Sequence, residues 1–296
     1  MGPSLPTTSS ATDRCDTIAG MGLTTYDHAG LTFDVTDAGP EDGIPVVLLH
    51  GFPADRHCWD AMSSQLAGAG LRTLAPDQRG YSPRARPAGR SAYALCELVG
   101  DVVALLDAAG IERAHLVGHD WGGAVAWAAA GSHPDRFETL TALSTPHPAA
   151  LRRAYRDPWQ ARHSGYLAWF QVPVLPELLF DRMFRPALLA SGLPRDITER
   201  YLARMAAPGA LSAALGWYRA LPLARGRVHR TRVPTTYLWG RDDGALGRRA
   251  AEGTTAMVEA DYRFVELAEG HWLPELAGEV CAREVLARVT SDMRSS

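Results

Sequence analysis

The stretch RAHLVGHDWGGAVAWAAA, residues 113–130, contains the pattern that decides the fold. It opens with AHLVG, a short apolar run typical of a buried strand, and ends in an alanine-rich segment typical of a helix. Asp120 lies between them, with Gly118 before it and Gly122 and Gly123 after it. At a strand-to-helix turn the apex residue is pushed out above the sheet, and the close backbone approach requires glycine on either side. We therefore predict that Asp120 is presented at the apex of such a turn; the alternative is a solvated aspartate that caps the helix.

Further strands and helices alternate on both sides of this turn. Two alternating segments at residues 23–27 and 31–39 are expected to form a hairpin. Apolar runs bounded by turn residues predict the remaining strands at residues 45–50, 72–76, 114–118, 137–145, 235–240 and 262–267. Helical patterns are found at residues 58–67 and 95–109, after Asp120, and at 274–290. This spacing predicts an α/β protein with a doubly wound, mostly parallel sheet flanked by helices.

The alternation of strands and helices stops between residues 147 and 232. This segment contains proline-punctuated helical pieces rich in Trp, Tyr, Leu and Arg, and no convincing strand. We interpret it as a helical cap inserted into one sheet domain, which then consists of residues 21–146 and 233–296. Residues 1–20, rich in Ser, Thr and Pro, are expected to be a disordered tail.

The composition is that of an ordinary globular protein and excludes several classes of function. Apolar residues make up 46% and charged residues 21% of the 296 residues. A net charge of −3 gives no electrostatic reason to expect a nucleic-acid or acidic-membrane partner. The sequence contains no lysine, which excludes Schiff-base chemistry and any pyridoxal enzyme that needs a lysine anchor.

Neither a membrane segment nor a metal or other cofactor is expected from the sequence. The first residues lack the apolar core of a secretory signal, and no run of about 18 apolar residues is present to span a membrane, so we expect a cytoplasmic protein. The four cysteines lie far apart without a CxxC pair, and we expect no metal site. The glycines around Asp120 lack the GxGxxG spacing of a nucleotide loop, and we expect no cofactor. The sequence leaves open whether the chain forms a homodimer.

Residues that would complete a catalytic site follow Asp120 in the order acid, then histidine. YLWGRDDGAL ends a predicted strand and offers Asp242 and Asp243, and ELAEGHWLPEL ends the last strand and offers His271. This order, together with the strand-end placement, is harder to obtain by chance than any single residue. The segment LLHGFP ends the third strand, and its loop can aim the N–H of Phe52 at a developing oxyanion, together with the N–H of Trp121.

Taken together, these segments resemble the α/β-hydrolase superfamily, and within it the epoxide hydrolases. The motifs that carry the resemblance are HGFP, PDQRGYSPRARP, GHDWGG, LSTPHP, WGRDD and GHW, and they span nearly everything after residue 20. The resemblance implies an α/β-hydrolase fold with an inserted helical cap, and it selects Asp243 over Asp242 as the acid. It also implies two cap tyrosines as proton donors, Tyr166 in SGYLAWFQVP and Tyr218 in GWYRALP. Each tyrosine has the alternative of a packing role.

An aspartate as nucleophile restricts the reaction. A carboxylate with a pKa near 4 is ionised at neutral pH and can attack an sp³ carbon directly to form an ester. That suits the carbon of an epoxide or a carbon that bears a halide, whereas an ordinary ester or amide would give an easily reversed anhydride. Water activated by His271, which Asp243 orients, would then clear the ester. We therefore expect a small apolar epoxide and water as substrates. The pocket that binds the epoxide is expected to be lined by Phe52, Trp59, Trp121 and Trp169; the alternative is that these side chains belong to the core.

Two other functions are compatible with Asp120 at this turn. A haloalkane or haloacid dehalogenase would use the same nucleophile. Haloalkane dehalogenases commonly pair the Trp after the nucleophile with an Asn or Gln from the HGxP loop, where Phe52 has no side-chain donor. Fluoroacetate dehalogenases follow the nucleophile with Arg, where this chain has Trp121. A non-catalytic binding protein of this fold would be expected to have lost a catalytic position, and none is missing here.

Overall fold

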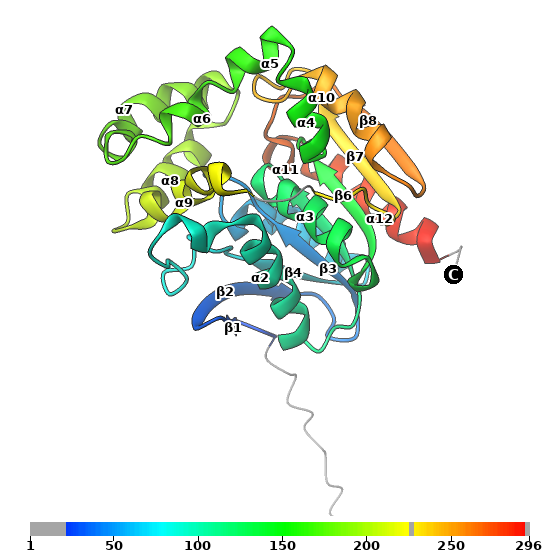
Figure 1. Cartoon of the computed structure of the whole chain (residues 1–296). Coiled ribbons are helices and arrows are strands. Elements are labelled where there is room, and N and C mark those ends of the chain that lie inside the picture. Colours follow the sequence, from blue (N-terminus) through cyan, green and yellow to red (C-terminus); the bar gives the residue numbers. More distant parts are fainter. Residues whose placement is uncertain (1–21, 225–227, 294–296) are drawn as a thin grey trace, which may run out of the picture.

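An eight-stranded sheet forms the centre of the protein (Figure 1). The computed structural model describes residues 22–224 and 228–293, so the tail expected at residues 1–20 lies outside the described residues. The strand order is β1-β2-β4-β3-β5-β6-β7-β8. The strands are β1 (Thr25–His28), β2 (Leu31–Ala38), β3 (Ile44–Leu49), β4 (Leu71–Pro76), β5 (Ala114–His119), β6 (Phe137–Leu143), β7 (Thr235–Gly240) and β8 (Tyr262–Leu267).

The pairing of the strands confirms the predicted α/β class. Strand β2 pairs antiparallel with β1 and β4, and all the other neighbours pair in parallel. Every residue of β5 and β7 is buried, as the continuous apolar runs predicted. Because parallel strands end at the same edge of a sheet, the loops after β3, β5, β7 and β8 meet there.

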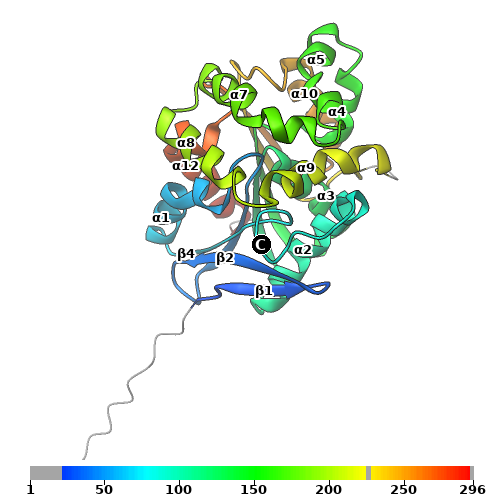
Figure 2. The same cartoon turned by 90° about the vertical axis from the view of Figure 1, so that its left-hand side faces the viewer.

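Helices cover both faces of the sheet. In Figure 2, α1 (Asp60–Gly68) and α12 (Gly278–Met293) lie on one face of the sheet, and α2 (Leu95–Ala108) and α3 (Trp121–Ser132) lie on the other face. The prediction of a single helix at residues 274–290 is wrong in one respect. It is divided into α11 (Leu273–Leu276) and α12, because Ala277 between them leaves the helical conformation, with φ −130° and ψ 27°.

The segment between β6 and β7 is helical, as predicted. Among its described residues, strand-like pairing is limited to one bridge between Thr231 and Val258. Its helices are α4 (Pro148–Ala154), α5 (Pro158–His163), α6 (Tyr166–Trp169), α7 (Leu175–Ala190), α8 (Arg195–Met205) and α9 (Ala210–Ala220). Figures 1 and 2 both place α5 and α7 at the top of the molecule, above the sheet. The inserted helices therefore cover one edge of the sheet.

The remaining elements are short. One further helix that the sequence did not predict, α10, follows β7. These elements are α10 (Arg248–Gly253) and the 3-10 helices η1 (Arg56–Trp59), η2 (Arg90–Tyr93), η3 (Pro134–Arg136), η4 (Leu221–Leu223) and η5 (Thr254–Met257). None of the helices in the described parts of the chain has the length and apolar character needed to cross a membrane.

Candidate active site

Asp120 occupies the sharp turn between β5 and α3. Its backbone has φ 51° and ψ −121°, a conformation that costs a non-glycine residue about 1–3 kcal/mol. The flanking glycines allow this turn, because a Cβ on Gly122 would lie 2.0 Å from the carbonyl oxygen of Leu49 and one on Gly118 would lie 2.3 Å from that of Gly122. Within this fully described turn the carboxylate makes no hydrogen bond that caps α3. The carboxylate is held instead by the loop after β3, where the N–H of Phe52 donates to Oδ1 at 2.8 Å.

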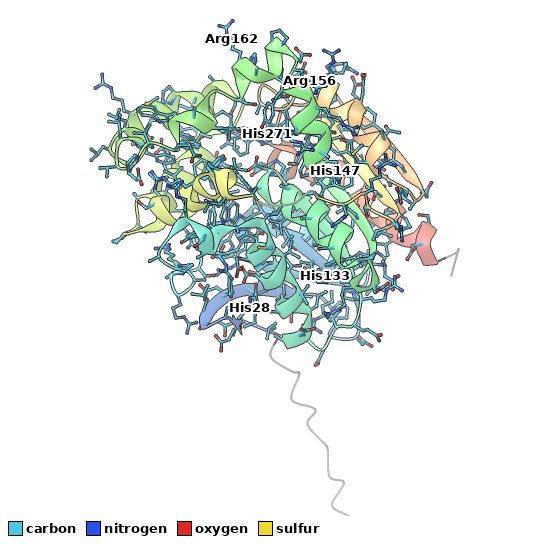
Figure 3. All side chains as sticks on the ribbon, viewed as in Figure 1. His28, His133, His147, Arg156, Arg162 and His271 are labelled. Carbon is cyan, nitrogen blue, oxygen red and sulfur yellow. The ribbon has the colours of Figure 1, made fainter. Side chains whose placement is uncertain are left out.

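His271 connects Asp120 to Asp243. Its Nδ1 donates to Oδ2 of Asp243 at 2.8 Å, and its Nε2 lies 3.4 Å from Oδ2 of Asp120. The backbone N–H groups of Ala245 and Leu246 donate to the other oxygen of Asp243, at 2.7 and 2.9 Å. The neighbouring Asp242 is exposed and lies 3.8 Å from Arg241. The structure therefore brings Asp243, and not Asp242, to the histidine, which Figure 3 labels.

Charges in the site favour an ionised Asp120 and a protonated His271 in the free protein. Burial by itself would lower the pKa of His271, but attraction to Asp243 and Asp120 outweighs burial and raises that pKa well above its ordinary value of 6.5. Burial would likewise raise the pKa of Asp120, but the hydrogen bond and charge of His271 outweigh it and lower that pKa. The two side chains form an ion pair at rest.

The loop that supplies the N–H of Phe52 is fixed by a buried histidine that the sequence did not single out. His50 Nε2 accepts the N–H of Gln78 at 3.1 Å, and its carbonyl oxygen accepts the side-chain amide of Gln78. His50 Nδ1 donates to the carbonyl oxygen of Gly51 at 2.9 Å. Burial lowers the pKa of His50, which keeps the imidazole neutral and able to accept. The N–H of Phe52 is therefore held toward Asp120 by a rigid support.

A cavity of about 560 Å³ adjoins the turn, and Asp120, Trp121, Tyr166 and Tyr218 all line it. The ring centroids of the two tyrosines are 6.1 Å apart, and the Tyr218 ring is 5.0 Å from that of Trp121. Although Tyr166 is 39% exposed and Tyr218 only 3%, desolvation in the cavity wall and the negative charge of Asp120 raise the pKa of both tyrosines above their ordinary value of 10. Both phenols therefore keep their protons at neutral pH.

Phe52, Trp59 and Trp169 are not among the described residues that line this cavity. The Phe52 ring packs instead against Phe170 and Phe180, with centroids 5.8 and 6.1 Å apart. Trp59 is fully buried, and Trp169 is partly buried against the core. The rings of Phe52, Trp59 and Trp169 thus pack in the interior beside the cavity, and a contact of any of them with a substrate stays a prediction. Phe52 adjoins the site through its backbone N–H and through its ring, which is 5.3 Å from the ring of Tyr218.

Three further residues position the site from the end of β6 and from the turn. The hydroxyl of Thr145 donates to the carbonyl oxygen of Asp120 at 2.7 Å. Ser144 Oγ and His119 Nε2 both donate to the carbonyl oxygen of His271, at 2.7 and 2.9 Å. Burial lowers the pKa of His119 to about 4, so its ring is neutral. Their placement at the carboxyl ends of β5 and β6 was the signal available in the sequence.

Comparisons with known proteins agree with this architecture. The family model described as alpha/beta hydrolase fold matches residues 44–277. The AB hydrolase superfamily protein YfhM of Bacillus subtilis (strain 168) is 37% identical, in a match that covers 82% of this chain and 89% of that protein. Epoxide hydrolase A of Mycobacterium tuberculosis (strain ATCC 25618 / H37Rv) is 33% identical, in a match that covers 86% of this chain and 94% of that protein.

The fold is also similar to that of a solved structure, described as "Novel epoxide hydrolases belonging to the alpha/beta hydrolases superfamily in metagenomes from hot environments". The two chains superpose with a TM-score of 0.78 and are 28% identical in sequence. The match covers 91% of this chain and 99% of that chain. The chain therefore belongs to the α/β-hydrolase fold family, and within that family it resembles the epoxide hydrolases.

Proposed function

We propose that the protein is an epoxide hydrolase, which adds water to an epoxide through an aspartyl ester and releases a vicinal diol. The observation that carries the proposal is the shared cavity wall, where the ionised carboxylate of Asp120 lies with the un-ionised phenols of Tyr166 and Tyr218. A carboxylate supplies the nucleophile, and a phenol supplies the proton that the departing ring oxygen requires. Similarity to proteins named epoxide hydrolases supports the same reaction.

In the proposed first step, Oδ2 of Asp120 attacks an epoxide carbon and the bond from that carbon to the ring oxygen breaks. Oδ1 is already occupied by the N–H of Phe52, whereas Oδ2 has only the 3.4 Å contact with His271. The electron pair left on the ring oxygen takes a proton from Tyr166 or Tyr218. The result is an ester of Asp120 with a hydroxyl group on the neighbouring carbon.

In the proposed second step, His271 activates water. Formation of the ester removes the charge of Asp120 and thus one of the two attractions that raise the pKa of His271. The proton that His271 then gives up restores the tyrosine, and the neutral imidazole takes a proton from water, which attacks the ester carbonyl. Oδ1 becomes the oxyanion of a tetrahedral intermediate, which the N–H of Phe52 already contacts. When this intermediate collapses, the bond from the carbonyl carbon to the alkyl oxygen breaks and the remaining proton of the attacking water passes to that oxygen, which releases the diol and restores the carboxylate of Asp120 beside protonated His271. Trp121 is the first residue of α3, so its N–H has no acceptor within the helix and is the second donor.

The decisive experiment measures the intact mass of a His271→Ala variant after incubation with a panel of epoxides and halogenated compounds. Without the base, Asp120 attacks but the ester is not cleared, so we expect a gain equal to one whole epoxide, located on Asp120. A gain equal to a substrate minus hydrogen halide would show dehalogenation instead. If no compound of the panel gives an adduct and the unmodified protein turns over none of the epoxides, the proposal is wrong.

A matched control tests the tyrosines in the same background. Replacing Tyr166 and Tyr218 together by Phe in the His271→Ala variant removes both proton donors but leaves the nucleophile. General acid catalysis contributes about 10²–10⁴-fold to a reaction rate, so we expect the rate of adduct formation to fall by about that factor. Adduct formation at an unchanged rate would contradict the role given to the two phenols.

A further inference from the structure

One face of the first inserted helix, α4, forms part of the cavity wall. Pro148, Arg152 and Tyr155, the last being the C-cap residue of the helix, all line the cavity. Residues spaced by three and four positions lie on the same face of a helix, so Arg152 is in the middle of this lining stripe. Arg152 and the adjacent Arg153 are both exposed, but only Arg152 is among the described residues that line the cavity.

Arg152 is the only cation among the described residues that line the cavity. The single other charged lining residue is Asp120. Within residues 22–224 and 228–293 the guanidinium of Arg152 takes part in no ion pair or hydrogen bond, whereas Arg219 on α9, for comparison, is held by Glu177 at 2.7 Å. The wall around it is largely apolar and includes Leu151, Leu167 and Leu246. Arg152 therefore contributes no ion pair to the fold and presents a free guanidinium to whatever occupies the cavity.

We infer that Arg152 is a binding site for the anionic group of the substrate, and that the substrate is an epoxide that carries a carboxylate. The inference rests on the proposed function. The epoxide reaches Asp120, the carboxylate pairs with Arg152, and the apolar part between them contacts the apolar wall. A guanidinium offers parallel N–H donors that match the two oxygens of a carboxylate.

The test compares a series of ω-epoxy alkanoic acids of increasing chain length with their methyl esters, which lack the charge. For the unmodified protein we expect kcat/KM to favour the acid at its best length by about tenfold, the size of a charge-assisted hydrogen bond at an accessible site. Arg152→Gln is expected to abolish this preference while hydrolysis of the esters continues. Arg153→Gln, the matched control on the same helix, is expected to retain it. The preference should weaken as salt is added, since the pair is accessible to solvent.

A second measurement distinguishes a failure of the anion site from a failure of the proposed epoxide hydrolysis. Calorimetric titration with the unreactive alkanoic acid of the best length and its methyl ester measures binding without turnover. If the acid binds more tightly in an Arg152-dependent manner but no epoxide is opened, the anion site stands and the proposed reaction fails. If the epoxides are opened but acids and esters are equal in both measurements, or the preference survives Arg152→Gln, the anion site is wrong and the proposed reaction stands.

Discussion

Asp120 and His271 carry opposite charges in the resting site, and this pairing sets the expected pH dependence of each chemical step. In the proposed reaction, alkylation requires an ionised Asp120, whose pKa is held below its ordinary value of 3.8 by His271. Its rate is therefore expected to stay level from neutral pH down to about pH 5 and to fall only as the pH drops through that lowered pKa. Hydrolysis of the ester requires a neutral His271, so its rate is expected to rise with pH and then level off.

Single-turnover fluorescence can separate the two steps, because the indole of Trp121 lies beside Asp120 on the cavity wall. Between about pH 5 and 9 we expect the alkylation rate to stay level and the hydrolysis rate to rise with pH before it levels off. In an Asp243→Asn variant the remaining attraction on His271 is lost, so the midpoint of the hydrolysis step should move to lower pH, while alkylation keeps its profile. An alkylation rate that falls together with the hydrolysis rate on acidification would contradict an ionised Asp120 at rest.

At this scale the sequence was informative where chemistry and chain position coincide. The turn around Asp120, the acid after β7 and the histidine after β8 all stand at strand ends, and the structure brings the three side chains together. The rings of Phe52 and Trp169 could not be assigned in the same way. An aromatic side chain serves a pocket or a core equally well, and only the packed structure decides which surface it meets.

At the scale of elements, α5 is joined to the turn that holds Asp243. The side chain of Gln160 on α5 is 1% exposed, and its amide donates to the carbonyl oxygen of Ala245 at 2.8 Å and accepts the N–H of Gly247 at 2.9 Å. The same turn donates the N–H groups of Ala245 and Leu246 to the carboxylate of Asp243. Gln160 is thus a positioning residue that stabilises the support of the acid from the inserted helices.

A Gln160→Leu variant tests this role. It leaves two backbone groups of the turn without partners, at a cost of about 1–3 kcal/mol in the free energy of unfolding, which a urea titration measures. Because Asp243 acts on His271 and not on Asp120, we expect hydrolysis of the ester to slow by about tenfold or more while alkylation is maintained. Gln171→Leu, which removes an amide bonded to Leu167 and Tyr218, is the control and should spare hydrolysis. Equal slowing of both steps by Gln160→Leu would indicate a general loss of structure.

The elements themselves were largely predictable, and their contacts were not. Strands β7 and β8 lie at the predicted residues. β7 is buried along its whole length, as a nearly continuous apolar run predicts, whereas β8 at the edge of the sheet has half-buried apolar residues interrupted by exposed Arg263 and Glu266. The helical character of the insertion was also predicted, from the absence of such runs. The bond from Gln160 to Ala245 joins residues 85 positions apart, and no periodic pattern encodes a pairing over that separation. The break between α11 and α12 was missed for a different reason: it depends on the backbone conformation of Ala277 alone, which the helical pattern does not specify.

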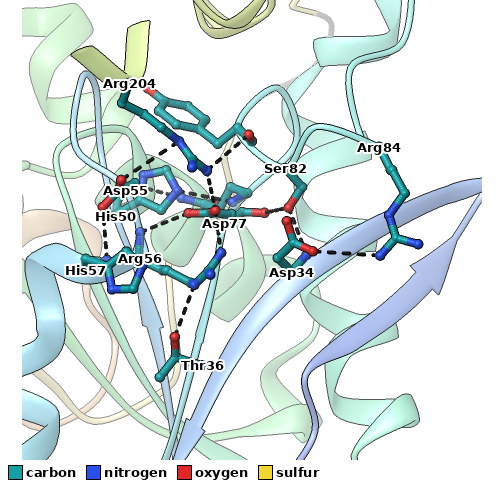
Figure 4. Close-up of polar contacts among 12 residues, drawn as sticks. Asp34, Thr36, His50, Asp55, Arg56, His57, Asp77, Ser82, Arg84 and Arg204 are labelled. Carbon is teal, nitrogen blue, oxygen red and sulfur yellow. Dashed lines mark hydrogen bonds and ion pairs between the residues drawn. The ribbon is translucent and has the colours of Figure 1, made fainter. Parts of the chain in front are cut away.

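For the whole molecule, a buried ion cluster ties the inserted helices to the sheet domain. Asp77, which follows β4 and is fully buried, accepts the guanidinium of Arg56 at 2.6 Å and the backbone N–H of the same residue at 3.1 Å. Arg204 of α8 also pairs with Asp77, and its Nε lies 3.9 Å from Asp55 (Figure 4). Asp55 and Arg56 follow the loop that carries the N–H of Phe52. One cluster therefore joins the inserted helix α8 to the loop that carries the oxyanion donor.

Removal of Arg204 should loosen this connection. In an Arg204→Gln variant Asp77 keeps Arg56, so we expect the free energy of unfolding to fall by about 1–3 kcal/mol, less than the 3–5 kcal/mol typical when a buried charge loses its last partner. An Asp77→Asn variant leaves two arginines facing each other, and the double variant completes a cycle that isolates the coupling between Arg204 and Asp77. Arg195→Gln, at the exposed start of the same helix, is the control. When the link between α8 and the sheet domain is loosened, KM for the best epoxide should rise more than kcat falls. If the coupling energy between Arg204 and Asp77 is near zero, the cluster does not hold α8 to the sheet domain.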